Sequence, residues 1–120
     1  MAALEFANSF GYAVIYPDMK LTFPHTDMMG GVNYRHRNLY INPKLVRAPK
    51  EHFFTVAHEL GHIIAVARGA PIPHKSLKMG GRAHIQHERR AYLWGWAVIR
   101  LFGLQVSKKE WRHWHWEAKL

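Results

Sequence analysis

The chain has no cysteine, and only 8 of its 120 residues are acidic. The absence of cysteine excludes disulfides, thiolate metal ligands and a cysteine nucleophile, and it fits a reducing compartment. Residues 1–5 lack the basic segment of a secretion signal, and the uncharged run 6–17 is too short and too polar to span a bilayer. We therefore expect a cytoplasmic protein without a membrane segment.

Basic residues greatly outnumber acidic ones. Lysine and arginine contribute 17 residues, which gives a formal net charge of +9. This excess indicates an acidic partner, either nucleic acid or an acidic protein, although solubility alone would also explain it. Apolar residues make up 48% of the chain, as in globular proteins. The length fits a single domain over residues 1–120.

The most informative stretch is 55–64, which reads Thr-Val-Ala-His-Glu-Leu-Gly-His-Ile-Ile. His58 and His62 are four residues apart, so on a helix they share one face and can bind one tetrahedral zinc ion. Glu59 then remains free to act as a general base. The alternative is a helix with surface histidines. The surrounding apolar rhythm predicts a packed helix over about residues 49–68, where unpaired polar groups are costly, and this favours the metal site.

The other patterns predict short strands and two further helices. Val-Asn-Tyr and Leu-Tyr-Ile, joined by four polar residues, are typical of a hairpin. Ser107 and Glu110 have the spacing of a capping box that begins the last helix. The expected elements are a helix or strand within 1–16, a loop over 18–31, strands at 32–34 and 39–41, an irregular segment over 70–87, and helices over 88–102 and 107–120.

A catalytic zinc ion usually has three protein ligands, so a third is needed. One common extension places a histidine six residues after the second, but Arg68 occupies that position. Glu88 is the favoured ligand because we expect it to begin a helix, where an anion is stabilised. Glu110 and Glu117 lie in the charged last helix, where we expect them to be solvated. The alternatives to Glu88 are His74, His84 and His87.

Residues 54–62, Phe-Thr-Val-Ala-His-Glu-Leu-Gly-His, resemble the active-site helix of the ImmA/IrrE-type metallopeptidases. In that family, short strands ending like residues 39–42 precede this helix. A second helix follows that begins with glutamates, and here it corresponds to residues 88–95. The resemblance covers roughly residues 30–102. It departs from the family pattern where Arg90 replaces an acidic residue and where Trp94 and Gly95 replace Phe-Ala.

This resemblance implies an α+β, gluzincin-like fold. A small antiparallel sheet would pack on the helix with the His-Glu-x-x-His motif and on a second metal-ligand helix, followed here by a C-terminal helix. It also implies a substrate class, a transcriptional repressor cut at a specific bond, and an origin in phages or mobile elements. The family often carries a helix-turn-helix DNA-binding domain, for which this chain has no room.

The expected site holds one zinc ion per chain through His58, His62 and Glu88. Zinc would activate a water molecule, and Glu59 would take its proton and deliver it to the leaving amine. A further donor would stabilise the oxyanion. The candidates by residue type are Tyr34, His84, His87 and Tyr92.

The C-terminal segment interleaves basic and aromatic residues. Trp111 and Trp114 are expected to pack on the domain, while the basic side would be exposed and could bind phosphates and bases. The leading hypothesis is a zinc endopeptidase of narrow specificity that acts on an intracellular regulatory protein. The alternative is a non-catalytic, metal-stabilised module that binds DNA or protein. The expected exposed residues are Lys108, Lys109, Arg112 and His115.

Overall fold

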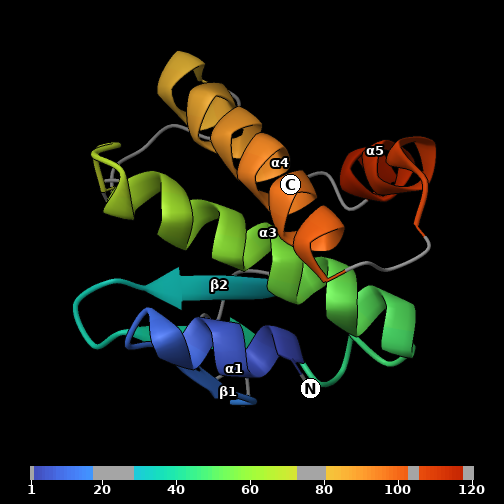
Figure 1. The fold of residues 1–120 in the computed structure, drawn as a ribbon, viewed down its shortest axis with the longest axis horizontal. Coiled ribbons are helices and arrows are strands. Elements are labelled where there is room, and N and C mark those ends of the chain that lie inside the picture. The colour runs from blue at the N-terminus through green and yellow to red at the C-terminus, as the bar shows by residue number, and fades with distance from the viewer. Residues whose placement is uncertain (1, 18–28, 73–80, 103–105, 118–120) are drawn as a thin grey trace.

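A computed structural model describes residues 2–17, 29–72, 81–102 and 106–117. Within these ranges the chain forms a compact α+β fold in which α3 lies between the sheet on one side and α4 on the other (Figure 1). In the described part of the chain, no helix is long and apolar enough to cross a membrane. The elements are α1 (Ala2–Ser9), β1 (Ala13–Ile15), β2 (Gly30–Asn33), β3 (Asn38–Ile41), α3 (Pro49–Ala67), α4 (Arg82–Leu101) and α5 (Lys108–Glu117).

The sheet has three strands in the order β1-β3-β2. β2 and β3 form the predicted antiparallel hairpin, with Gly30 opposite Ile41 and Asn33 opposite Asn38. The expectation of an antiparallel sheet is wrong for β1, which runs parallel to β3. A tight turn fixes the direction of β2 against β3, whereas a longer connection separates β1 from the hairpin and allows the parallel pairing.

The motif helix α3 begins at Pro49 and ends at Ala67, within one residue of the prediction. Glu51 accepts a hydrogen bond from the backbone N–H of Ala48 at 3.3 Å, which stabilises the first turn. Gly69 follows the helix with a φ of +105°, a conformation that favours glycine. The helix is buried from Phe53 to Gly61, because it packs against α1, both strands of the hairpin and α4.

The helices α3 and α4 cross at two glycines. A Cβ added to Gly61 would clash with the backbone carbonyl oxygen of Ala91, and one added to Gly95 would lie 2.9 Å from the carbonyl oxygen of Ala57. Any side chain at either position would therefore push the helices apart. Gly95, a departure from the family pattern, is needed here for close approach, because a Cβ there would also lie 2.8 Å from the ring of Trp111.

The start of α4 differs from the prediction. The helix begins at Arg82, so Glu88 lies in its second turn instead of opening it. The expected stabilisation of Glu88 by a helix N-terminus therefore does not apply, because that effect fades after the first turn. The part of the predicted 70–87 loop that is described after residue 80 is largely helical.

The last helix, α5, is held by a capping box and by its tryptophans. Ser107 Oγ accepts a hydrogen bond from Glu110 N–H at 3.1 Å, as predicted. Glu110 also forms an ion pair with Lys50 of α3. Trp111 is fully buried, and its Nε1–H donates to the carbonyl oxygen of Tyr92 in α4 at 3.1 Å. Residues 118–120 of the predicted helix lie outside the described residues.

Candidate metal centre

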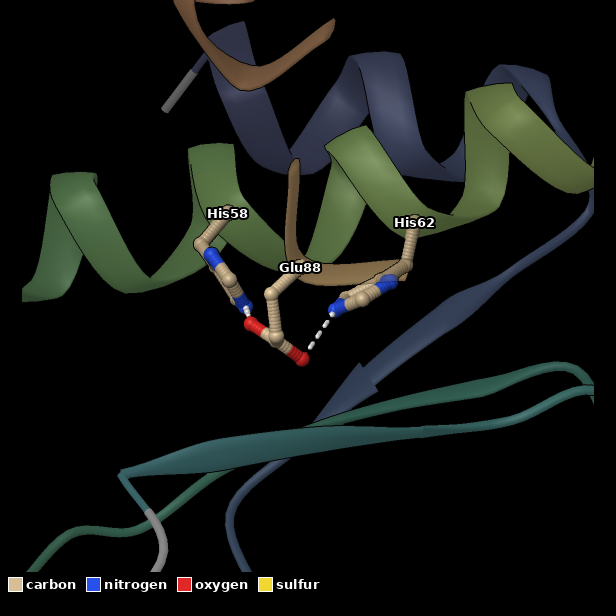
Figure 2. A group of neighbouring side chains, drawn as sticks. All are labelled: His58, His62 and Glu88. Carbon is tan, nitrogen blue, oxygen red and sulfur yellow. Dashed lines mark ion pairs between the residues drawn. The ribbon is translucent and has the colours of Figure 1, made fainter. Parts of the chain in front are cut away.

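Three side chains predicted as metal ligands meet between α3 and α4 (Figure 2). His58 and His62 project from successive turns of α3, and Glu88 projects from α4 with one carboxylate oxygen towards each imidazole. The distances are 3.2 Å from His58 Nε2 to Glu88 Oε2 and 3.3 Å from His62 Nε2 to Glu88 Oε1. One ligand atom from each residue lies within 4.8 Å of the others.

These separations suit a common metal ion. Ligand atoms at tetrahedral positions about 2.0–2.1 Å from zinc lie roughly 3.3 Å from one another. Each imidazole Nε2 lies at about this distance from a carboxylate oxygen of Glu88, His58 from Oε2 and His62 from Oε1. Glu88 Oε2 is buried and has no hydrogen-bond partner, so a cation would satisfy it. Two imidazole nitrogens and a carboxylate can hold zinc, but they also bind other divalent transition metals. The arrangement therefore supports a metal site but does not identify which metal binds there.

The three ligands also influence one another's protonation. Burial raises the pKa of Glu88, but its close contacts with the two histidines and their positive charge outweigh burial and hold the pKa well below its usual range. Burial lowers the pKa of His62, yet its hydrogen bond to Glu88 and the charges of Glu59 and Glu88 reverse this, so the net pKa is raised. The raised pKa of His62 and the lowered pKa of Glu88 both mean that the carboxylate favours a positive charge beside it, as in a cation site.

Glu59, the predicted general base, is adjacent to this cluster and only 4% exposed. Its Oε1 lies 3.9 Å from His58 Nε2, which leaves it close to any water held by the same ligands. Burial raises the pKa of Glu59, the two histidines oppose this, and Glu88 adds to it, with a net increase. A carboxylate with a raised pKa is a better proton acceptor in catalysis near neutral pH.

Glu59 lies on the side of α3 that faces the sheet. A Cβ added to Gly30 of β2 would lie 3.4 Å from Glu59 Cγ and 2.8 Å from the methyl group of Thr55. A glycine at the start of β2 therefore lets the strand approach α3 at the turn that carries Thr55 and Glu59. Tyr34 follows β2 and is half-buried; burial raises its pKa, and so do the charges of Glu59, Tyr12 and Glu88.

The other predicted candidates lie on α4. His84 is one turn before Glu88, with its Nε2 3.8 Å from Glu88 Oε1, so it borders the cluster. His87 is buried, and burial followed by the charge of Arg90 lowers its pKa. Tyr92 stacks on Trp111 with ring centroids 6.0 Å apart, which indicates a packing role.

Neither alternative histidine on α4 joins the three-ligand group found among the described residues. His74 lies outside those residues. Glu110 is used in its ion pair with Lys50, and the side chain of Glu117 lies outside the described part of the structure. Of the candidates considered for the third ligand, Glu88 is the one that the structure brings to both motif histidines.

One residue near the centre was missed from the sequence. His115 of α5 was expected to be exposed, but its ring lies 4.9 Å from that of His58 and 5.2 Å from that of Tyr92, centroid to centroid. Burial and the charges of His58 and His62, partly opposed by Glu88, lower the pKa of His115 to about 4. The missed signal was its spacing of four residues from Trp111, which places both side chains on the buried face.

The cluster thus combines two imidazoles, one carboxylate ligand and a second buried carboxylate positioned beside them. Such a set can bind a divalent cation and transfer a proton next to it. Protein-family models, curated proteins and solved structures were all searched, and none of the three searches finds a match to this chain.

Proposed function

We propose that this protein is a zinc-dependent endopeptidase of narrow specificity. The observation that carries the proposal is the convergence of His58, His62 and Glu88 with Glu59 beside them. A structural metal site needs ligands but no general base. The buried Glu59, with its raised pKa, therefore supports a catalytic site over a purely structural one.

In this proposal each residue has a distinct task. His58, His62 and Glu88 would hold a zinc ion, which would supply Lewis acidity towards a water molecule and the peptide carbonyl. Glu59 accepts a proton from the attacking water and later donates it to the leaving amine. The raised pKa of Tyr34 keeps its phenol protonated, so its hydroxyl can donate a hydrogen bond to the developing oxyanion.

The substrate class rests on the resemblance of residues 54–62 to the ImmA/IrrE-type peptidases. On that basis the substrate is an intracellular regulatory protein such as a DNA-binding transcriptional repressor. The gluzincin-like packing belongs to the same proposal, with α3 and α4 as the metal-bearing pair and the small sheet against α3. A net charge of +9 fits a substrate that carries acidic segments or is bound to DNA.

A peptide library tests the proposal even while the substrate is unidentified. The zinc-loaded protein and its Glu59→Gln variant are each incubated with proteome-derived peptides, and new termini are identified by mass spectrometry. We expect cleavage at a small set of sequences, slowed roughly 100- to 10,000-fold in Glu59→Gln while zinc is retained. Cleavage by Glu59→Gln at the wild-type rate would show that Glu59 is not the base and that the mechanism is wrong.

A non-catalytic binding module is the second candidate, favoured by the arginines on the outer face of α4. Arg82, Arg89 and Arg100 are exposed there. Binding to DNA through such residues weakens steeply as salt increases. If no library peptide is cleaved, while DNA binding is salt-dependent and is lost in Arg89→Ala/Arg100→Ala, this candidate replaces the peptidase.

A further inference from the structure

Two buried ring nitrogens beside the metal centre have no hydrogen-bond partner. They are Nδ1 of His58 and Nε2 of His115. Their rings lie 4.9 Å apart, centroid to centroid, with an angle of 51° between the ring planes. The orphaned Oε2 of Glu88 is explained as a metal ligand, but these two nitrogens are not. Buried polar atoms without partners are rare in native proteins, so the pair calls for an explanation.

The two nitrogens are chemically complementary. When Nε2 of His58 faces Glu88 and a metal, the neutral ring must carry its proton on Nδ1, which makes Nδ1 a donor. A neutral imidazole at His115 has one acceptor nitrogen. The ring centroids are only 4.9 Å apart, which is close enough for a hydrogen bond between the two imidazoles, directly or through one water molecule.

Few other rings near His58 can act as the acceptor. Among the described residues, the aromatic rings in contact with His58 are those of His62, Trp114 and His115. An indole has a donor but no acceptor, which excludes Trp114. His62 directs its Nε2 towards Glu88. His115 is therefore the ring whose acceptor is free of the metal cluster.

The position of His115 is firmly set by the packing of α5. Its ring contacts Tyr92 of α4 on edge at 5.2 Å and Trp111 of its own helix at 5.7 Å. Trp111 is buried and anchored to α4 by its hydrogen bond to the carbonyl oxygen of Tyr92. A ring held between two helices in this way can restrict the orientation of its neighbour.

We propose that His115 is a positioning residue of the metal centre, whose imidazole accepts the Nδ1–H of His58 directly or through one water molecule. This contact holds His58 in the tautomer that presents Nε2 to the metal. Partners of this kind orient metal-bound histidines and increase their basicity. The inference rests on the proposed metal site and does not require that the protein be a peptidase.

Zinc affinity in three variants tests the inference. His115→Phe keeps an aromatic ring against Tyr92 and Trp111 but removes the acceptor, and His115→Gln supplies an amide acceptor. His113→Ala is the matched control, because His113 is exposed on the same helix. Dissociation constants are measured by competition between Zn²⁺ and a chromogenic chelator, after thermal unfolding has shown that each metal-free variant is folded.

We expect zinc affinity to fall about 10- to 100-fold in His115→Phe, to recover at least in part in His115→Gln, and to stay at the wild-type value in His113→Ala. Wild-type affinity in His115→Phe would overturn the inference while leaving the metal site intact. A wild-type protein that binds no zinc would overturn both.

Nitrogen NMR of the wild-type protein gives a second test that needs no variant. Two-bond proton–nitrogen correlations of the zinc-loaded protein report which ring nitrogens carry protons. We expect a slowly exchanging proton on His58 Nδ1 and an unprotonated acceptor nitrogen on His115. A His58 Nδ1 proton that exchanges rapidly with water would contradict the inference, even if His115→Phe did not fold.

Discussion

The two sides of α3 contribute different parts of the candidate site. On the sheet side lie Glu59, packed under Gly30, and Tyr34, whose pKa is raised in part by the charge of Glu59. On the helix side, Glu88 of α4 meets His58 and His62. The groups proposed for proton transfer and oxyanion binding therefore lie on the sheet side of α3, while the groups suited to holding a cation lie where α3 meets α4.

This difference suggests that chemistry and metal binding can be perturbed separately. Changes on the sheet side should lower the catalytic rate and leave the metal in place. Changes on the helix side should weaken metal binding or the fold, because Glu88 reaches the histidines only while the two helices remain in close contact. Variants on each side show whether the two functions separate in this way.

On the sheet side, the largest effect after that of Glu59→Gln is expected from Tyr34→Phe, which removes the hydroxyl proposed to bind the oxyanion. We expect kcat on a cleaved peptide to fall roughly 100- to 1,000-fold, with zinc content unchanged. Tyr92→Phe is the matched control, because Tyr92 stacks on Trp111 on the helix side and should keep kcat. Equal losses in the two variants would remove the distinction between the tyrosines.

On the helix side, Gly61→Ala is expected to destabilise the protein. Alanine normally stabilises a helix relative to glycine by about 1 kcal/mol. At Gly61 the added methyl group would clash with the backbone carbonyl oxygen of Ala91, which cannot rotate away. We expect a net loss of about 1–3 kcal/mol of unfolding free energy, as for other overpacked interiors, together with weaker zinc binding.

Denaturant unfolding of metal-free Gly61→Ala measures this loss. Ala97→Ser, an exposed change on α4, is the control and should lie within about 0.5 kcal/mol of the wild type. Unchanged stability and zinc affinity in Gly61→Ala would mean that the close helix crossing does not hold Glu88 in place.

The pH dependence of zinc binding should follow His62. In the metal-free protein the pKa of His62 is raised above its ordinary 6.5, so zinc must displace a proton that nearby carboxylates stabilise. The pKa of Glu88 is lowered, so Glu88 stays ionised in this range. As the pH is lowered, zinc affinity should therefore start to fall while the pH is still above 6.5. The expected decrease is about tenfold per pH unit for each proton that zinc displaces.

Competition titrations from about pH 5.5 to about pH 8 follow this effect directly. In Glu88→Gln the partner that raises the pKa of His62 is neutral, so the decline should shift to lower pH and start from a weaker affinity. An unchanged midpoint in Glu88→Gln would show that the His62–Glu88 contact does not govern proton competition.

The smallest effect is expected from Lys50→Ala, which removes the ion pair between α3 and Glu110 of α5. Both side chains are largely exposed, at 57% and 43%, and exposed pairs contribute little to stability. We expect no measurable change in Tm or zinc affinity. A clear loss of zinc affinity would mean that this pair, rather than Trp111, keeps α5 against the site.

The parts of the site that depend on local sequence were predicted well. The helix over 49–67 follows from its apolar rhythm, from Pro49 at its start and from Gly69 after its end, all of which act within a few residues. The hairpin and the capping box of α5 are local in the same sense. The approach of Glu88 to both histidines was expected from ligand chemistry. The expectation that Glu88 begins α4 was wrong, because the helix begins at Arg82.

The parts that depend on distant contacts were not predicted. The parallel pairing of β1 with β3 joins segments that are far apart in the chain, with β2 between them in sequence. Glycine is needed at position 95 because α4 there meets Ala57 and Trp111. These contacts are not visible in the sequence, where Gly95 only differs from the alanine of the resembling family. His115 was placed on the exposed face because its basic neighbours dominated the pattern, whereas the burial of Trp111 one turn earlier determines its side.

Metal content is the most direct test of the central claim that α3 and α4 together form one metal centre. Zinc is measured by mass spectrometry in the purified wild type, His58→Ala, Glu88→Ala and Glu110→Ala, the last being a carboxylate remote from the cluster. We predict one zinc per chain in the wild type and in Glu110→Ala, and loss of zinc in the other two. Full zinc content in Glu88→Ala would contradict the claim, because the ligand from α4 would then be unnecessary.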